Sequence, residues 1–277
     1  MILSTGGIFL IVPNGWSTQF AVRYLSERRI GGQTGFNFSK DKGTSNAYGQ
    51  AVDIQQPEVW FKTAYRMNDM HRFALYVSGF HQDQQSYFGI TNYKAKQTNS
   101  YANLQYEFGY KEKNVLKTGL SYRHLNLSEN ISFSDNSLNR TYAGLYKKVE
   151  NIPGIFVENT LITAGDKLTW IAGIRADRHN QLGWEITPRT LLKYEVTDKL
   201  TLRGSVGTGW RTANIFSENI GLLVSSRDIV FAEALRPEKA VNLGFNATQK
   251  YKSSSVEGYF SLDFYRTKFE NQIFPDY

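Results

Sequence analysis

Apolar and polar residues alternate with a period of two along most of the chain. From Val241 to Thr248, apolar side chains occupy every second position, and asparagine, glycine or threonine occupies the others. The segments Leu168–Asp177, Leu200–Gly207 and Val256–Phe264 repeat this alternation. A period of two places one set of side chains on each face of a β-strand. No segment shows a convincing helical period, so the pattern predicts an all-β, antiparallel protein.

The pattern predicts about thirteen strands, with boundaries good to roughly ±2–4 residues. Many of them reach the ~9–11 residues that a tilted membrane strand needs, whereas globular strands most often have about 5–6. The predicted strands cover residues 2–12, 17–26, 31–39, 58–67, 72–82, 98–109, 114–126, 154–163, 167–178, 186–196, 199–208, 238–249 and 255–268.

The predicted connections alternate in length. Short turns are expected at Glu27–Ile30, Asn68–His71, Tyr110–Lys113, Gly165–Asp166, Thr197–Asp198 and Lys250–Ser254. Long polar loops are expected at Lys40–Pro57, Asp83–Gln97, Leu127–Pro153, His179–Glu185 and Gly209–Pro237. Outer-membrane barrels have short periplasmic turns and long extracellular loops, whereas a soluble sandwich has no reason to keep its long loops at one end. The alternation therefore favours a membrane barrel.

The strand count indicates that this barrel is partial. If the first strand runs toward the long loops, an odd number of strands leaves the last strand there as well. Single-chain bacterial outer-membrane barrels have an even number of strands. Met1–Val12 has neither a basic n-region nor a small-residue cleavage site, so no signal peptide is expected. We therefore expect a fragment of a larger barrel.

Composition narrows the possibilities further. The 277 residues include no cysteine, which excludes disulfides, cysteine-bearing zinc sites and cysteine nucleophiles. No apolar run approaches the ~18 residues of a membrane helix. Aromatic residues make up 14% of the chain. Some of them are expected in two interfacial girdles, with the short-turn ends of strands carrying Trp170, Tyr194 and Tyr251 and the long-loop ends carrying Trp60, Tyr101 and Tyr122.

Two motifs on neighbouring predicted strands carry a family resemblance. The first is Gly-Trp-Arg-Thr-Ala-Asn at 209–214, and the second is Leu-Arg-Pro-Glu-Lys-Ala-Val-Asn-Leu-Gly at 235–244. Together they resemble the barrel of TonB-dependent outer-membrane receptors. Supporting similarity extends through the strands at 155–159 and 168–177 and through Thr187-Pro188-Arg189. The resemblance covers most of 150–277 well and 1–150 mainly by pattern.

The resemblance implies a barrel of about 22 strands that is closed by an N-terminal plug. Residues 1–277 would be a partial barrel domain, incomplete at both ends and lacking the plug and its TonB box. The implied function is TonB-energised uptake of a scarce nutrient such as siderophore-iron or cobalamin across the outer membrane of a Gram-negative cell. The implied partners are outer-membrane lipid, the missing plug and, through it, TonB, and a small ligand such as a metal chelate. Neither catalysis nor a cofactor is expected.

Two groups of residues are candidates for these contacts. Extracellular loops meet the cargo first, which makes polar residues of the loop after 209 candidate ligand-binding residues: Arg211, Asn214, Asn219, Arg227 and Arg236. In the alternative interpretation, this region only shapes a turn. By parity, one group of arginines projects opposite the apolar face, where it would line the lumen and contact the plug: Arg23, Arg66, Arg123, Arg175 and Arg203.

Other function classes fit the sequence less well. An outer-membrane hydrolase needs a Ser/His/acid set, and only His179 among the histidines near long-loop ends is predicted to point inward. No H-E-x-x-H or G-x-S-x-G motif occurs, and no metal site is expected. The basic residues are dispersed among acids, which argues against nucleic-acid binding. A porin and a soluble carbohydrate-binding sandwich remain alternatives.

Overall fold

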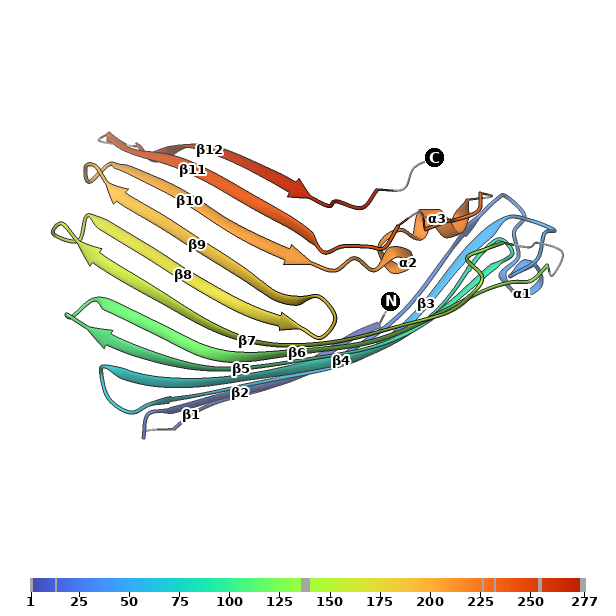
Figure 1. Cartoon of the computed structure of the whole chain (residues 1–277), viewed down its shortest axis with the longest axis horizontal. Coiled ribbons are helices and arrows are strands. Elements are labelled where there is room, and N and C mark those ends of the chain that lie inside the picture. Colours follow the sequence, from blue (N-terminus) through green and yellow to red (C-terminus); the bar gives the residue numbers. More distant parts are fainter. Residues whose placement is uncertain are drawn as a thin grey trace.

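The computed structural model describes residues 2–12, 14–135, 140–225, 227–231, 233–253 and 256–274. Within them, twelve strands form one antiparallel sheet in which each strand pairs with its sequence neighbours. Figure 1 shows the sheet as a curved wall that is open between β1 and β12. The all-β antiparallel prediction is therefore confirmed. The strands are β1 (Ile2–Val12), β2 (Trp16–Gly32), β3 (Gly49–Arg66), β4 (His71–Phe88), β5 (Thr91–Tyr110), β6 (Asn114–Phe133), β7 (Gly144–Thr163), β8 (Leu168–His179), β9 (Gly183–Glu195), β10 (Leu200–Arg211), β11 (Glu238–Ser253) and β12 (Val256–Glu270).

The described residues contain three short helices, all on the connections at the long-loop end of the sheet (Figure 1). The helix α1 (Phe38–Asp41) follows β2, whereas α2 (Ile215–Glu218) and α3 (Ile220–Val224) lie between β10 and β11. In this part of the chain, no helix is long and apolar enough to cross a membrane.

The predicted turn at Glu27–Ile30 and the predicted strand at 31–39 are both wrong. β2 continues through the charged residues that suggested a turn, and the chain then enters α1, whose N-cap is Asn37. The charges are accommodated in the sheet by ion pairs, because Arg28 pairs with Asp53 on β3 and Arg29 pairs with Glu27 at 2.7 Å. One predicted strand is thereby lost, which gives twelve strands instead of thirteen.

This correction also reverses the direction of the first strand. β1 runs away from the long-loop end to a short turn before β2, so the predicted direction is wrong. Since the described strand number is even, the odd count no longer supports a partial barrel.

Several predicted long loops are instead extensions of strands. β4 has 18 residues and β5 has 20, and only Gly89 and Ile90 connect them, so the predicted loop at Asp83–Gln97 is mostly strand. Most of Leu127–Pro153 is also paired, and the predicted loop at His179–Glu185 is reduced to a turn at 180–182. Twenty residues at roughly 3.3 Å each span about 65 Å, twice the ~30 Å hydrocarbon thickness of a bilayer. These strands are polar here because they extend beyond that thickness.

The two faces of the sheet carry different side chains and are called here the inner face and the outer face. The inner face bears Tyr93, Arg123 and Arg175 and is covered at the long-loop end by the segment 212–237. The opposite outer face carries an exposed apolar row across neighbouring strands, which includes Leu104, Leu120 and Ile155. The apolar core lies on the inner face at the long-loop end and consists of Phe88, Tyr93, Ala95, Ile131, Tyr142, Phe216 and Leu223.

The register also tests the predicted aromatic girdles. Trp170, Tyr194 and Tyr122 lie on the outer face, as expected for a girdle. Trp60 pairs with Ala21 and Tyr101 pairs with Arg123, which puts both aromatic side chains on the inner face. Their assignment to the girdle is therefore wrong, because it rested on their nearness to a strand end and not on the face of the strand that each side chain occupies.

Candidate functional site

The connection between β10 and β11, residues 212–237, folds back onto the inner face of the sheet. We call it the β10–β11 loop. Its apolar anchors are Phe216 on α2 and Leu223 on α3, which are buried against residues of β5 and β6. The connection between β6 and β7 adds polar anchors, since the Arg140 side chain donates to the carbonyl of Arg227 at 2.6 Å and the Thr141 N–H donates to Asp228 at 3.0 Å.

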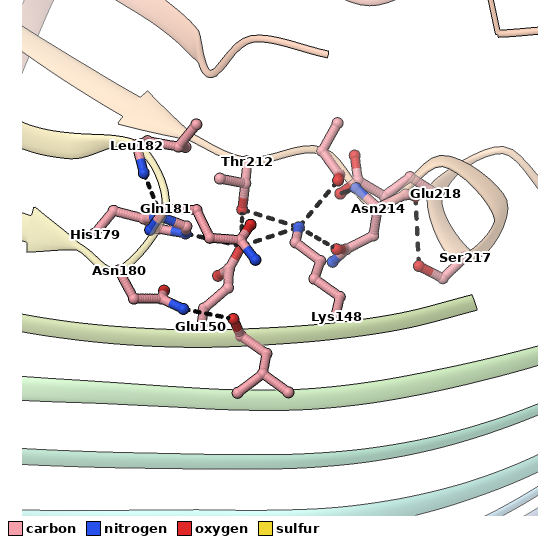
Figure 2. A network of polar contacts seen from close by, with 12 residues as sticks. Lys148, Glu150, His179, Asn180, Gln181, Leu182, Thr212, Asn214, Ser217 and Glu218 are labelled. Carbon is pink, nitrogen blue, oxygen red and sulfur yellow. Dashed lines mark hydrogen bonds and ion pairs between the residues drawn. The ribbon is translucent and has the colours of Figure 1, made fainter. Parts of the chain in front are cut away.

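Lys148 on β7 is the polar centre of this docking, as Figure 2 shows. Its Nζ donates to the Thr212 hydroxyl at 3.0 Å, to the Ala213 carbonyl at 3.1 Å and to the Asn214 side chain at 2.7 Å. The Glu150 carboxylate lies 3.0 Å from the same nitrogen. One ammonium group therefore binds three consecutive residues at the start of the loop.

Glu150 and His179 extend the network to the turn between β8 and β9. The Thr212 hydroxyl donates to Glu150, and His179 Nδ1 accepts the backbone N–H groups of Gln181 at 3.1 Å and Leu182 at 3.2 Å. An Nδ1 that accepts carries no proton, so the neutral ring carries its proton on Nε2. Nε2 lies 3.4 Å from Glu150 Oε1 and has no hydrogen bond of good geometry among the described residues.

Glu129 on β6 is a third anchor for the loop. Its carboxylate accepts the Tyr93 hydroxyl at 2.7 Å and the backbone N–H of Ser217 on α2. Burial raises the pKa of Glu129, and it also raises the pKa of Tyr93 well above its usual range. A carboxylate is therefore held in an apolar setting by one side-chain donor and one backbone donor.

Two cavities adjoin the β10–β11 loop. A cavity of about 430 Å³ lies between the loop and the strands, and Lys148, Glu150 and His179 are among its lining residues. A second cavity of about 500 Å³ lies between the loop and the residues that follow β12. Arg236 and Phe231 line both cavities. The site thus combines an arginine with an aromatic ring next to a charged, hydrogen-bonded wall.

The structure brings four of the five predicted ligand-binding residues to these cavities. Asn214 lines the smaller cavity, Asn219 and Arg227 line the larger one, and Arg236 lines both. Arg211 lies outside both linings and forms ion pairs with Glu238 at 2.5 Å and Glu218 at 2.8 Å. Its placement favours a role in holding the loop. Contact of any of the five with a cargo stays a prediction.

All five predicted lumen arginines lie on the inner face, and each has a protein partner. The partners are Glu58 for Arg23, Asp69 for Arg66 at 2.8 Å, Asp177 for Arg123 at 3.9 Å, Asp177 for Arg175 at 2.7 Å, and Asn246 for Arg203 at 2.8 Å. Arg123 also lies over the Trp210 ring at 5.5 Å. Their contact with a plug stays a prediction.

Sequence reasoning missed the residues that dock the loop, because all of them fell within predicted loops. These residues are Tyr93, Glu129, Lys148 and Glu150. A usable signal was present, since Leu125, Leu127, Glu129 and Ile131 alternate with polar residues. That pattern is the period of a strand with one covered face. His179 does point inward as predicted, but its hydrogen bonds shape a turn.

Comparison with known proteins identifies the fold and the family. Residues 5–277 match the family model described as TonB dependent receptor-like, beta-barrel. Comparison with curated protein sequences finds no match. Among solved structures, the alcaligin outer-membrane receptor FauA of Bordetella pertussis matches with a TM-score of 0.67 and 12% identity, over 99% of this chain and 44% of its own.

The ferric yersiniabactin uptake receptor FyuA of Yersinia pestis matches with a TM-score of 0.65 and 14% identity, over 96% of this chain and 45% of its own. FpvA of P. aeruginosa, solved with bound pyoverdine and iron, matches with a TM-score of 0.66 and 10% identity, over 96% of this chain and 41% of its own. The chain thus spans less than half the length of these structures, which fits a partial barrel. The match of the family model across nearly all 277 residues shows that this chain belongs to the TonB-dependent receptor-like β-barrel family.

Proposed function

We propose that the chain is the barrel portion of a receptor that captures a ferric siderophore outside the cell and imports it with energy passed through TonB. The observation that carries the proposal is the β10–β11 loop, which folds over the inner face and leaves cavities of about 430 and 500 Å³ there. Ligand sites of small molecules have volumes of about 300–1,000 Å³. The long-loop end is where cargo arrives in an outer-membrane barrel.

The family supplies the frame for this proposal. Its members are receptors and transporters of the Gram-negative outer membrane, so the predicted location and the predicted absence of catalysis are confirmed. Energisation by TonB, a plug and the identity of the cargo are parts of the proposal, because the chain spans less than half of its structural neighbours.

Among the lining residues, Arg236 favours a ligand with an anionic group, and the aromatic and aliphatic residues beside it favour apolar portions. Arg236 is shared by both cavities, and no hydrogen bond or ion pair engages its guanidinium among the described residues. Phe231 and Leu235 lie beside it in both linings. A guanidinium pairs bidentately with carboxylate oxygens, while the aromatic ring packs against apolar parts of a chelator. Two of the three neighbouring structures are linked to an iron chelate, FyuA as the ferric yersiniabactin uptake receptor and FpvA in complex with pyoverdine and iron.

Binding to the full-length receptor tests the cargo. We expect Arg236→Ala to weaken binding of the cognate ferric siderophore by about ten- to a hundredfold, since one charged contact is typically worth ~1.5–3 kcal/mol. Titration of intrinsic fluorescence with a panel of ferric chelates measures this affinity. The matched control is Arg266→Ala, because Arg266 lies on β12 away from both cavities. Equal affinity of R236A and the unmodified receptor would contradict the assigned site.

Uptake in cells tests the energy source. We expect accumulation of the radioactive ferric chelate to stop in a strain without TonB, while binding at the cell surface persists. Uptake that continues at the same rate without TonB would refute energisation and favour a porin.

A further inference from the structure

The His179 ring carries a buried hydrogen-bond donor that no described protein group accepts. The residue ends β8 and is 2% exposed. Its Nδ1 accepts the backbone N–H groups of Gln181 and Leu182, so the neutral ring carries its proton on Nε2. Among the described residues, Nε2 has no hydrogen-bond partner. Because a buried N–H without an acceptor is costly and rare in folded proteins, this donor is a candidate contact for a ligand.

The Glu150 carboxylate lies beside this donor but has its nearer oxygen occupied (Figure 2). Oε1 accepts the Thr212 hydroxyl and lies 3.0 Å from Lys148 Nζ. The same oxygen is the one that lies 3.4 Å from His179 Nε2. Since all three contacts fall on Oε1, Oε2 keeps its capacity to accept a hydrogen bond. A free donor and a free acceptor therefore lie next to each other.

The ring is fixed before any ligand arrives. The turn at 180–182 holds Nδ1 through two backbone donors. The Trp210 ring packs edge to face against His179, with ring centroids 6.0 Å apart. A donor that is already oriented loses little conformational freedom when a ligand binds, and this favours affinity.

The charges around the donor favour a neutral ligand group. Both His179 and Glu150 line the cavity of about 430 Å³ under the β10–β11 loop. The Lys148 ammonium already pairs with the Glu150 carboxylate, so this part of the wall has no net charge. A ligand anion at Nε2 would lie against the carboxylate, and a ligand cation would face an N–H donor.

We propose that His179 and Glu150 recognise an alcohol hydroxyl on the imported chelate. A hydroxyl oxygen accepts the Nε2 proton while the hydroxyl proton is donated to the carboxylate, so one ligand group satisfies both side chains. A carbonyl oxygen could accept but has no proton to donate. The inference rests on the proposed function, because the hydroxyl belongs to the chelate that the receptor imports.

Binding of the hydroxyl requires a small movement of Glu150. Hydrogen bonds of about 2.7–2.9 Å on each side of an oxygen place the two protein atoms roughly 4.5–5 Å apart. The carboxylate therefore turns away from its present 3.4 Å contact with Nε2 when the hydroxyl enters. The glutamate stem has rotatable bonds, whereas the turn and Trp210 hold the ring.

Matched chelates test the inference in the full-length receptor. The probes are ferric dihydroxamates and ferric catecholates, each made with and without one alcohol hydroxyl on the linker between the metal-binding groups. We expect the unmodified receptor to bind the hydroxylated member of the accepted pair about tenfold more tightly, as measured by fluorescence titration. Equal affinity within every pair that binds would overturn the inference and leave the proposed function intact. Failure of all the chelates to bind would contradict both.

Two substitutions separate the donor from the turn. H179N keeps an acceptor close to the position of Nδ1 and loses the donor at Nε2, whereas H179Q keeps a donor close to Nε2. We expect H179N to bind both members of a pair equally and H179Q to retain part of the preference. The control is H81N, because His81 is an exposed histidine on the outer face of β4. A preference that survives in H179N, or one that is lost in H81N, would overturn the assignment. If H179N fails to fold, equal binding of the two chelates by the unmodified receptor still refutes it.

Discussion

At the residue scale, Gly154 permits the closest packing on the inner face. A Cβ at this position would lie 2.1 Å from Asp177 Oδ1 and 2.9 Å from Arg175 Nη2. Asp177 is 2% exposed and pairs with Arg175 at 2.7 Å, so the ion pair occupies the space that a larger residue needs. Glycine here allows a buried ion pair to lie directly on a neighbouring strand.

We expect Gly154→Ala to reduce the free energy of unfolding of the full-length receptor by about 1–3 kcal/mol, the usual cost of overpacking. The measurement is the urea midpoint in lipid vesicles. Gly204→Ala is the control, because a Cβ there meets nothing within 4 Å. Equal midpoints for the two variants would show that Asp177 moves aside without cost.

Glu129 makes docking of the β10–β11 loop depend on pH. Burial raises its pKa in the folded state, so its contribution to docking is fully present below the unfolded pKa of about 4.3 and is lost as pH rises through the folded value. Glu129→Gln keeps an acceptor for Tyr93 and Ser217 but cannot ionise. We expect protection of residues 212–237 from proteolysis to fall as pH rises in the unmodified protein and to fall less in the variant. Glu257→Gln, at an exposed ion pair with Lys252, should behave like the unmodified protein.

At the scale of elements, the β10–β11 loop is held by side chains from strands that are distant in sequence. Lys148 bonds residues that lie 64 to 66 positions away, and Phe216 packs into a cluster that includes Phe88. The helices α2 and α3 are too short to be stable alone, since isolated helices below ~12–15 residues are marginal in water. The strands therefore impose the loop's conformation.

Truncating the apolar anchor should release the loop. We expect Phe216→Ala to weaken docking by roughly 3–5 kcal/mol, the cost of emptying a buried aromatic site. Hydrogen exchange of residues 212–237 should then rise, while exchange in β4 to β7 stays unchanged. Val230→Ala is the control, because Val230 is 75% exposed. Equal exchange in both variants would show that the polar anchors alone hold the loop.

Strands whose outer face meets lipid were predicted correctly from the sequence, whereas strand segments whose outer face meets water were not. The bounds of β8 were predicted to within one residue, because the lipid-facing side of Leu168–Asp177 is apolar and the opposite side is mostly polar. From Asp83 to Phe88, β4 extends beyond the lipid and its outer face meets water. The outward side chains there are therefore polar, and the alternation of apolar and polar residues that identifies a membrane strand is lost. For this reason the segment was predicted to be a loop. The candidate site was accessible only in part, since Asn214 and Arg236 lie in a recognisable motif region whereas Lys148 joins the site through tertiary contacts.

At the scale of the whole molecule, the sheet has two unpaired edges, β1 and β12. β12 is exposed along its length and carries Phe260, Leu262 and Phe264 on its outer face. Edges of this kind pair with other chains. We expect the 277-residue chain, produced alone in detergent, to form oligomers, whereas the full-length receptor is monomeric. Size-exclusion chromatography with light scattering checks this, and a monodisperse monomer of the isolated chain would contradict it.

The unbroken pairing of β5 with β6 constrains how such a sequence can change in length. Every one of the 20 residues of β5 has a single partner, so side-chain identity depends on odd and even position along the whole strand. Deleting one residue near the middle would exchange the faces beyond that point, exposing Tyr93 to water and turning Lys94 and Lys96 inward. Insertions and deletions that preserve the fold must therefore add or remove residues in pairs, or fall in the connections.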